Sequence, residues 1–246
     1  GQALASVAQG LAPLLGPQTL VLPAMNGVPW WFCKSLPELE QPLDSVDPGG
    51  LIERLIPFEK VLGCVVHAST TVAEPGLVRH KGGNGLIVGE PGGGRSDRAQ
   101  RVVDLLARGG FDVTCSDNVR QAIWYKLWGN MTMNPVSALT GAPCDRILDD
   151  PLVRGFISSV MREAQAIGAG FGIPIHQAPE ERHAVTRKLG SFKTSMLQDV
   201  EAGKPVELDA LVTVVRELGQ KTGVPTPFTD ALLGLARVHA QVHGLY

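Results

Sequence analysis

The stretch Asn118–Thr140 reads NVRQAIWYKLWGNMTMNPVSALT, and the interpretation of the whole chain starts from it. Four of its polar residues are spaced four, four and three apart, so on an α-helix they fall within an arc of about 80°. These residues are Lys126, Asn130, Asn134 and Ser137. The adjoining surface is apolar, with Ile123, Trp124, Leu127, Trp128 and Met131. The pattern predicts a helix with a wide buried face and a narrow polar seam along one edge of that face.

The polar seam has two interpretations. An ammonium group and amides beside so much apolar surface are costly unless something pairs with them. In the first interpretation, Lys126 extends to solvent along its aliphatic stem and the asparagines bond to neighbouring backbone. In the second, the seam binds a ligand. The helix alone leaves both open.

Composition excludes several classes of partner. With 44% hydrophobic and 19% charged residues, the 246-residue chain has the make-up of a soluble globular protein of one large or two modest domains. A net charge of −2 gives no reason to expect nucleic acid or an anionic membrane as a partner. No apolar run approaches the roughly 20 residues that span a bilayer, and the N-terminus lacks the basic start of a signal peptide.

The four cysteines are far apart, without a C-x-x-C pair or clustered histidines; they are Cys33, Cys64, Cys115 and Cys144. This spacing argues against a zinc site. It favours reduced thiols, so we expect a cytoplasmic protein without a metal centre.

In the first half, the order of the expected helices, strands and turns is typical of an α/β fold. We expect a helix over residues 3–15, a buried parallel strand over 19–23 (TLVLP), and a turn at Met25–Gly27. In doubly wound sheets the loop after a strand binds ligands, which makes Asn26 a candidate. Asn-Gly is also a good turn pair, which is the structural alternative for Asn26.

Further elements are expected before residue 117. Strands are predicted at 61–69 and 111–115, together with an antiparallel hairpin of 76–80 and 86–89 joined by residues 81–85. Asp47 is expected to cap a short helix over 51–55, and another helix should run from Asp97 to Arg108. Gly92–Gly94 precedes that helix but fits no phosphate-binding pattern, and Asp97 would repel a phosphate. We therefore interpret it as a flexible surface loop.

Strand signals stop after Asp117. Helices are expected at 118–140, 150–170, 178–190, 194–202, 207–222 and 227–242. We therefore predict an α/β part up to residue 117 and an all-α part from residue 118. The chain opens with Gly and no helix cap precedes Ala3, so we expect a segment upstream.

A second stretch, Ser191–Glu207, reads SFKTSMLQDVEAGKPVE. Thr194 and Ser195 suit a helix start, and Glu207 opens the next helix, where an acidic residue is favourable. Taken alone, the stretch has a complete structural explanation.

Together, the two stretches resemble the ketopantoate reductase (2-dehydropantoate 2-reductase) family. KLWGNMTMNPVSALT resembles that family's K-x-x-x-N-x-x-x-N-P helix, and TSMLQD with a Glu twelve residues after its Ser resembles the second signature. LPAMNG resembles the family's strand-end Asn-Gly, and GCVVHAS followed by VRH resembles its hairpin region. The resemblance covers essentially the whole chain.

The resemblance implies NADPH-dependent reduction of ketopantoate to pantoate for pantothenate synthesis. It implies an α/β partial Rossmann-like domain followed by an all-α C-terminal domain. Residues 1–117 would be the C-terminal part of a Rossmann-like NADP-binding domain, and residues 118–246 a helical substrate and catalytic domain.

Site residues follow from the same resemblance. Lys126 would be the general acid, and Asn130 and Asn134 would hold the substrate and orient the lysine. Ser195 would bind the substrate carboxylate and Glu207 its hydroxyl, while Asn26 would lie near the nicotinamide. These residue types suit the chemistry, because hydride addition builds negative charge on the ketone oxygen, which an ammonium stabilises and protonates. Burial would lower the pKa of such a lysine.

Parts of the family pattern are not in the chain: the Gly-rich cofactor loop, the first βαβ unit, the basic residue for the 2′-phosphate and a further lysine near the cofactor. We expect these upstream of Gly1, and the chain alone to be inactive without the cofactor loop. Two alternatives stay open: a reductase of another small branched 2-oxo acid, and a non-catalytic helical fragment that dimerises or binds a ligand. A homodimer is also left open.

Overall fold

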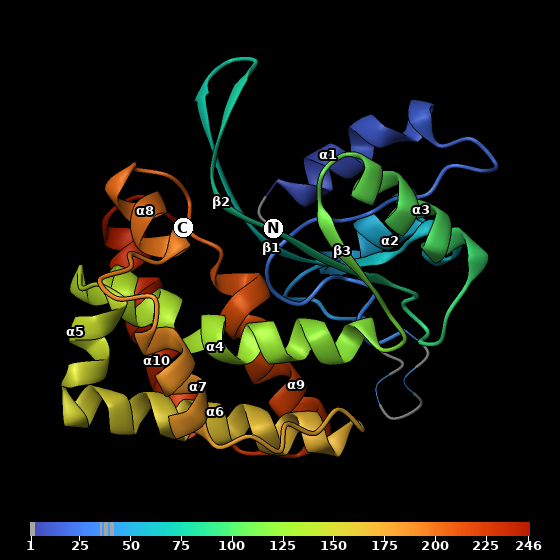
Figure 1. The fold of residues 1–246 in the computed structure, drawn as a ribbon. Helices are drawn as coiled ribbons and strands as arrows, with labels where there is room; N and C mark the ends of the chain where they lie inside the picture. Colours follow the sequence, from blue (N-terminus) through green and yellow to red (C-terminus); the bar gives the residue numbers. More distant parts are fainter. Residues whose placement is uncertain (1–2, 35, 37–38, 40–41) are drawn as a thin grey trace.

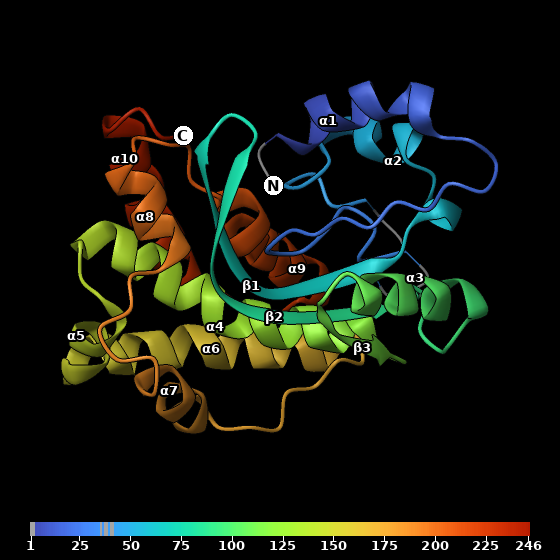
Figure 2. The ribbon, with the colours of Figure 1, turned by 45° about the horizontal axis from the view of Figure 1, so that its top comes forward.

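The computed structural model describes residues 3–34, 36, 39 and 42–246 (Figure 1). The first two residues of the expected N-terminal domain lie outside this part. A small sheet with short helices occupies one side of the molecule and a group of longer helices the other (Figures 1 and 2). The N-terminal elements are α1 (Leu4–Leu11), η1 (Ala12–Leu14), η3 (Pro48–Gly50), α2 (Leu51–Leu55) and η4 (Phe58–Lys60).

The sheet has the order β1-β2-β3, with β1 at Gly63–Glu74, β2 at Leu77–Gly89 and β3 at Asp112–Ser116. β1 and β2 are antiparallel, whereas β2 and β3 are parallel. The parallel connection passes through α3 (Asp97–Arg108), whose N-cap Ser96 accepts a hydrogen bond from the Ala99 amide. The predicted helix over 97–108 and the strand over 111–115 are confirmed.

The predicted hairpin of 76–80 with 86–89 is wrong. Residues 77–89 form one continuous strand, and the hairpin turn lies between β1 and β2, at Pro75-Gly76. The glycines of residues 82–85 lie where the pairing register with β1 shifts. Gly83 has φ +70°, and a Cβ there would lie 2.2 Å from the His67 carbonyl oxygen. These glycines therefore serve a bulge and a close strand approach, not a turn.

The predicted strand over 19–23 is reduced to a single parallel bridge between Val21 and Val61. The Val21 amide donates to the Lys60 carbonyl oxygen, and the Leu62 amide donates to the Val21 carbonyl oxygen. The segment runs between Pro17 and Pro23, which have no amide hydrogen for a longer ladder. The helix predicted over 3–15 is found as α1 and η1.

Asp47 holds the start of α2, as predicted. Its Oδ1 accepts from the Ile52 amide at 2.7 Å and its Oδ2 from the Glu53 amide at 3.0 Å. Asp47 is almost fully buried, so water cannot reach these two amides to take the place of its carboxylate.

We expect Asp47→Ala to lower the free energy of unfolding by about 0.5–2 kcal/mol, the range for losing a helix cap. The measurement is denaturant unfolding, with Asp44→Ala as control, because the structure gives the Asp44 side chain no capping bond. Equal stability of the two variants would contradict the capping role.

The helical side consists of α4 (Val119–Thr140), α5 (Cys144–Asp149), α6 (Pro151–Gly170), α7 (Pro179–Arg187), α8 (Ser195–Glu201), a π-helical turn η5 (Asp209–Thr213), α9 (Val214–Thr222) and α10 (Pro227–Val242). The sequence predicted all of these except the short α5 and the π-helical turn. α4 contacts the sheet as well as α6, α8 and α10. It is therefore the central element of the fold.

One apolar cluster joins the two sides of the molecule. It contains the predicted apolar face of α4, in which Ile123, Trp124, Leu127, Trp128 and Met131 are all buried. Trp124 packs against Phe32 and Phe171, with ring centroids 6.0 and 5.1 Å away. A smaller cluster fills the space between the sheet and α3. The wide buried face predicted for residues 118–140 is confirmed.

Candidate active site

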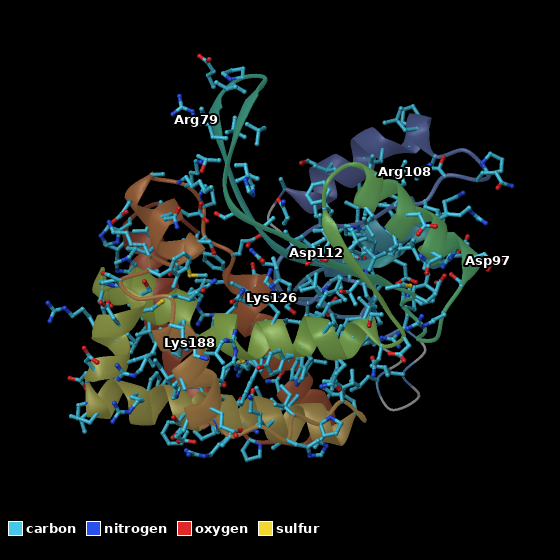
Figure 3. All side chains as sticks on the ribbon, viewed as in Figure 1. Arg79, Asp97, Arg108, Asp112, Lys126 and Lys188 are labelled. Carbon is cyan, nitrogen blue, oxygen red and sulfur yellow. The ribbon has the colours of Figure 1, made fainter. Side chains whose placement is uncertain are left out.

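Lys126 lies between the sheet and the helices, near the centre of the molecule (Figure 3). Its Nζ donates to the Asn26 Oδ1 at 2.8 Å and to the Val66 carbonyl oxygen at 2.5 Å. The ammonium group is thus held inside the protein by the strand-end loop and by β1. The arrangement in which Lys126 extends to solvent is excluded.

Burial lowers the pKa of Lys126 from its ordinary value of 10.5, because the charged form is poorly solvated there. The negative charges of Cys64, when ionised, and of Glu207 act in the opposite direction. Burial raises the pKa of Cys64 itself to about 11, so that thiol is neutral at ordinary pH. Glu207 is therefore the carboxylate that favours the ammonium form of Lys126.

The loop that carries Asn26 is fixed by its neighbour Gly27. Gly27 has φ +79°, and a Cβ at this position would lie 2.3 Å from the Ala210 carbonyl oxygen. That same carbonyl oxygen accepts from the Val28 amide at 2.9 Å. Only glycine combines this backbone conformation with such a close approach. The Asn26-Gly27 pair is therefore a tight turn that also orients Asn26 toward Lys126.

A cleft of about 640 Å³ brings together most of the predicted site. Asn134 Nδ2 donates to Ser195 Oγ at 3.4 Å, which joins α4 to the first turn of α8. Thr194 caps that turn by accepting from the Leu197 amide, as predicted. The lining of the cleft includes Asn26, Lys126, Asn130, Asn134 and Ser195.

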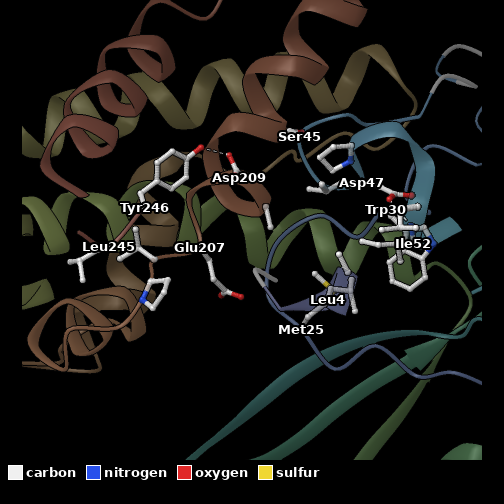
Figure 4. A pocket seen from close by; sticks show the side chains of 17 residues that line it. Leu4, Met25, Trp30, Ser45, Asp47, Ile52, Glu207, Asp209, Leu245 and Tyr246 are labelled. Carbon is white, nitrogen blue, oxygen red and sulfur yellow. Dashed lines mark hydrogen bonds between the residues drawn. The ribbon is translucent and has the colours of Figure 1, made fainter. Parts of the chain in front are cut away.

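Glu207 lines a smaller cavity of about 230 Å³ together with Asn26 and Lys126. The two cavities share Asn26, Ala68 and Lys126, so Lys126 stands where they meet. Glu207 also borders a third cavity of about 540 Å³, with its carboxylate directed toward the side of Met25 and Leu4 (Figure 4). All six predicted residues therefore line one or both of two cavities that have Asn26 and Lys126 in common.

Sequence reasoning missed the contribution of the β1–β2 arm, the antiparallel pair formed by Gly63–Glu74 and Leu77–Gly89. The Val66 carbonyl oxygen binds Lys126, and residues 68–72 with Lys81 line the larger cleft. A backbone acceptor leaves no signal in a sequence. The pKa of His67 is lowered by burial and by the positive charges of Lys126 and Arg182, and its carbonyl oxygen faces Gly83 across the arm.

Two other polar features are structural. Ser137, the last residue of the polar seam, donates to the Ala142 carbonyl oxygen at 2.7 Å near the end of α4. In the loop Gly92–Gly94, the amide of Gly93 donates to Glu90 and that of Gly94 donates to Asp117. These two amides are engaged within the protein, in keeping with the absence of a phosphate-binding pattern.

Among the described residues there is no group of three His, Cys, Asp or Glu side chains that could hold a metal ion. The four cysteines are free. The described helices include none of the length and apolarity needed to cross a membrane.

Comparison with known proteins decides the family. The family model "Ketopantoate reductase PanE/ApbA C terminal" matches residues 118–240. The chain is 42% identical to the 2-dehydropantoate 2-reductase of Mesorhizobium japonicum, across 96% of this chain and 73% of that protein. The chain belongs to the ketopantoate reductase family.

Solved structures agree with this membership in the ketopantoate reductase family. A crystal structure from Ralstonia solanacearum MolK2, described provisionally as a ketopantoate reductase, is 57% identical with a TM-score of 0.95, covering 100% of this chain and 75% of that one. A D-mandelate dehydrogenase in a ternary structure with NADH and anilino(oxo)acetate has a TM-score of 0.83 at 21% identity, covering 100% of this chain and 74% of that one. At that identity the likeness shows the fold alone.

Proposed function

We propose that the protein catalyses NADPH-dependent reduction of 2-dehydropantoate to pantoate. The observation that carries the proposal is the half-buried ammonium group of Lys126, which is held by Asn26 and Val66 and lines two cavities. The family to which the chain belongs supports the same reaction. We also propose the domain division at residue 117 that the sequence predicted, with the parallel β2–β3 pair belonging to the Rossmann-like part and α4 to the catalytic part.

Lys126 would act as the general acid. When bound, the nicotinamide supplies the hydride that reduces the ketone carbon. The Lys126 ammonium group stabilises the negative charge on the ketone oxygen and transfers its proton to that oxygen. Asn26 and the Val66 carbonyl oxygen keep Nζ in place while the charge develops. Burial makes that interaction stronger than it would be in water.

The remaining residues would bind and orient the substrate. Ser195 and Asn134, which contact each other, donate hydrogen bonds to its carboxylate from one side of Lys126. Asn130 lines the same cleft and helps to place the ketone. Glu207 accepts a hydrogen bond from the 4-hydroxyl on the other side of Lys126.

The described residues fit the nicotinamide end of the cofactor and not its diphosphate. Asn26 follows the bridged segment at Val21, at the position where α/β sheets bind nucleotides. The 246 residues contain no G-x-G-x-x-G sequence, and two amides of the Gly92–Gly94 loop are already engaged. A cytoplasmic location is proposed with this function, and the four free thiols suit that compartment.

The test is the steady-state oxidation of NADPH and NADH by the whole protein with a panel of 2-oxo acids. The panel contains ketopantoate, 3,3-dimethyl-2-oxobutanoate, which lacks only the 4-hydroxyl, and other small branched 2-oxo acids. We expect the highest kcat/KM with ketopantoate and NADPH. A higher value for an acid without the hydroxyl would assign the protein to the alternative, a reductase of another branched 2-oxo acid.

The reduction rate should depend on the protonation of Lys126. The ammonium form is the acid, so kcat/KM falls as the pH rises through the pKa of Lys126, which burial places below 10.5. Because the Glu207 carboxylate raises that pKa, Glu207→Gln should move the alkaline limb of the pH profile to lower pH. The measurement is kcat/KM against pH for both enzymes.

Glu201→Gln is the matched control for this shift, since Glu201 is exposed at the end of α8 and pairs with Lys193. The alkaline limb of the kcat/KM profile of Glu201→Gln should coincide with that of the unmodified protein. An unmoved limb in Glu207→Gln would show that the Glu207 carboxylate does not raise the pKa of the titrating acid.

A further inference from the structure

The residues on both sides of Glu207 are attached to the two residues that follow the end of α10, Leu245 and Tyr246 (Figure 4). One position before Glu207, the Val206 amide donates to the Leu245 carbonyl oxygen at 3.0 Å. Two positions after Glu207, Asp209 Oδ1 accepts from the Tyr246 hydroxyl at 2.7 Å. Glu207 therefore lies in a short stretch that is anchored on each side by the same two residues.

The end of α10 fixes the position of Leu245. Gly244 has φ +68°, and the Leu245 amide donates to the Ala240 carbonyl oxygen at 2.7 Å, which is the usual hydrogen bond of a helix that ends at glycine. Leu245 and Val206 are each only 4% exposed, and both belong to the main apolar cluster. The carbonyl oxygen that binds the Val206 amide is thus held by the packed core.

The Tyr246 hydroxyl is a directed hydrogen-bond donor. Although Tyr246 is 48% exposed, its hydroxyl is bound to Asp209, whose Oδ1 also accepts from Thr213 Oγ1 at 3.0 Å. Partial burial, the hydrogen bond to Asp209 and the negative charge of Asp209 raise the pKa of Tyr246 to about 12. The phenol therefore keeps its proton at ordinary pH. Because Asp209 begins the π-helical turn η5, this bond fixes the start of that turn.

Leu245 and Tyr246 act at a distance from Lys126. They border the cavity of about 540 Å³ and line neither of the two cavities that Lys126 lines. Glu207 borders the cavity of about 540 Å³ and also the one of about 230 Å³ that contains Lys126. A shift of Leu245 or Tyr246 would therefore reach a bound substrate by moving Glu207.

From these contacts we propose that Leu245 and Tyr246 are positioning residues for Glu207 and thereby set the preference of the enzyme for a 2-oxo acid with a 4-hydroxyl group. The inference rests on the proposed function, in which Glu207 accepts a hydrogen bond from that hydroxyl. A carboxylate that is already held in place binds a hydroxyl more tightly than one that must first be ordered. Tyr246→Phe removes one of the two anchoring bonds and keeps the aromatic ring.

The experiment measures kcat/KM for ketopantoate and for 3,3-dimethyl-2-oxobutanoate with the whole protein, Tyr246→Phe and Tyr125→Phe. Tyr125 is the matched control, because its hydroxyl also donates to a side-chain oxygen, Gln177 Oε1 at 2.7 Å, and it lines none of the three cavities. We expect Tyr246→Phe to lower the ratio of the two kcat/KM values about three- to tenfold, the range for one hydrogen bond, and Tyr125→Phe to leave it unchanged. An unchanged ratio in Tyr246→Phe, or an equal loss on both substrates, would overturn the proposal.

A double variant tests whether Tyr246 acts through Glu207. In Glu207→Gln the selective hydrogen bond is already lost, so the addition of Tyr246→Phe should lower the ratio no further. A further fall would assign Tyr246 an independent effect and would overturn the proposal. If Glu207→Gln alone left the ratio unchanged, the role of Glu207 in the proposed function would be wrong, and hydrogen exchange then decides the positioning role by itself.

Hydrogen exchange measures the positioning of the Glu207 stretch without turnover. The Val206 amide reports on the contact, because it donates to the Leu245 carbonyl oxygen. We expect this amide to exchange about three- to tenfold faster in Tyr246→Phe than in the unmodified protein and in Tyr125→Phe. Equal exchange in all three proteins would overturn the proposal, whatever the ratio of kcat/KM values.

Discussion

Lys126→Ala should lower kcat for ketopantoate reduction by about 100-fold or more, the usual size of a general-acid contribution. The variant removes both the proton donor and the positive charge that stabilises the developing alkoxide. It leaves Asn26 Oδ1 and the Val66 carbonyl oxygen without this donor but also removes a buried charge, so the fold should persist.

Lys188→Ala provides the matched lysine truncation, because Lys188 is exposed after α7 and lines none of the three cavities of the site. Its kcat should equal that of the unmodified protein. Melting curves of both variants separate a catalytic loss from a loss of structure. If Lys126→Ala turned over at the unmodified rate, Lys126 would be a structural residue.

Glu207→Gln should lower kcat/KM for ketopantoate by about 10- to 150-fold, which corresponds to about 1.5–3 kcal/mol for a hydrogen bond to a charged group. The same change should matter much less for 3,3-dimethyl-2-oxobutanoate, because that acid has no hydroxyl for Glu207 to bind. The comparison is made at a pH below both alkaline limbs, where Lys126 is protonated in each enzyme.

A purely structural role for Glu207 predicts a different pattern. Glu207 directly precedes the helical turn that begins at Leu208, where loss of the charge costs only a few tenths to about 1 kcal/mol of stability. In that case both substrates would lose kcat/KM equally. Equal losses would remove Glu207 from substrate recognition and leave it a helix-start residue.

The helical half is the more predictable part of the fold. Residues 118–140 carry both the periodic apolar face and its polar edge, and a helix with such a face has few other ways to pack. The strand pairing is less predictable, since glycine marks turns and bulges alike. The glycines of residues 82–85 suggest a turn, although Pro75-Gly76 supplies it.

In the candidate site too, some features are predictable from the sequence and others are not. The spacing along α4 is enough to place Lys126, Asn130 and Asn134 on one edge of the helix. That Asn26, 100 residues earlier, and the Val66 carbonyl oxygen bind the lysine depends on tertiary contacts that no local pattern records.

The close contact at Gly27 limits how the molecule can move. Val28 and Ala210 are hydrogen-bonded through the backbone, and Gly27 leaves no room between the strand-end loop and the helical turn. A hinge that separated the sheet from the helices at this point would break that bond and pull Asn26 away from Lys126. We therefore expect Asn26, Lys126 and the Glu207 segment to move as one rigid body, together with Val66 of β1, whose carbonyl oxygen also binds Lys126.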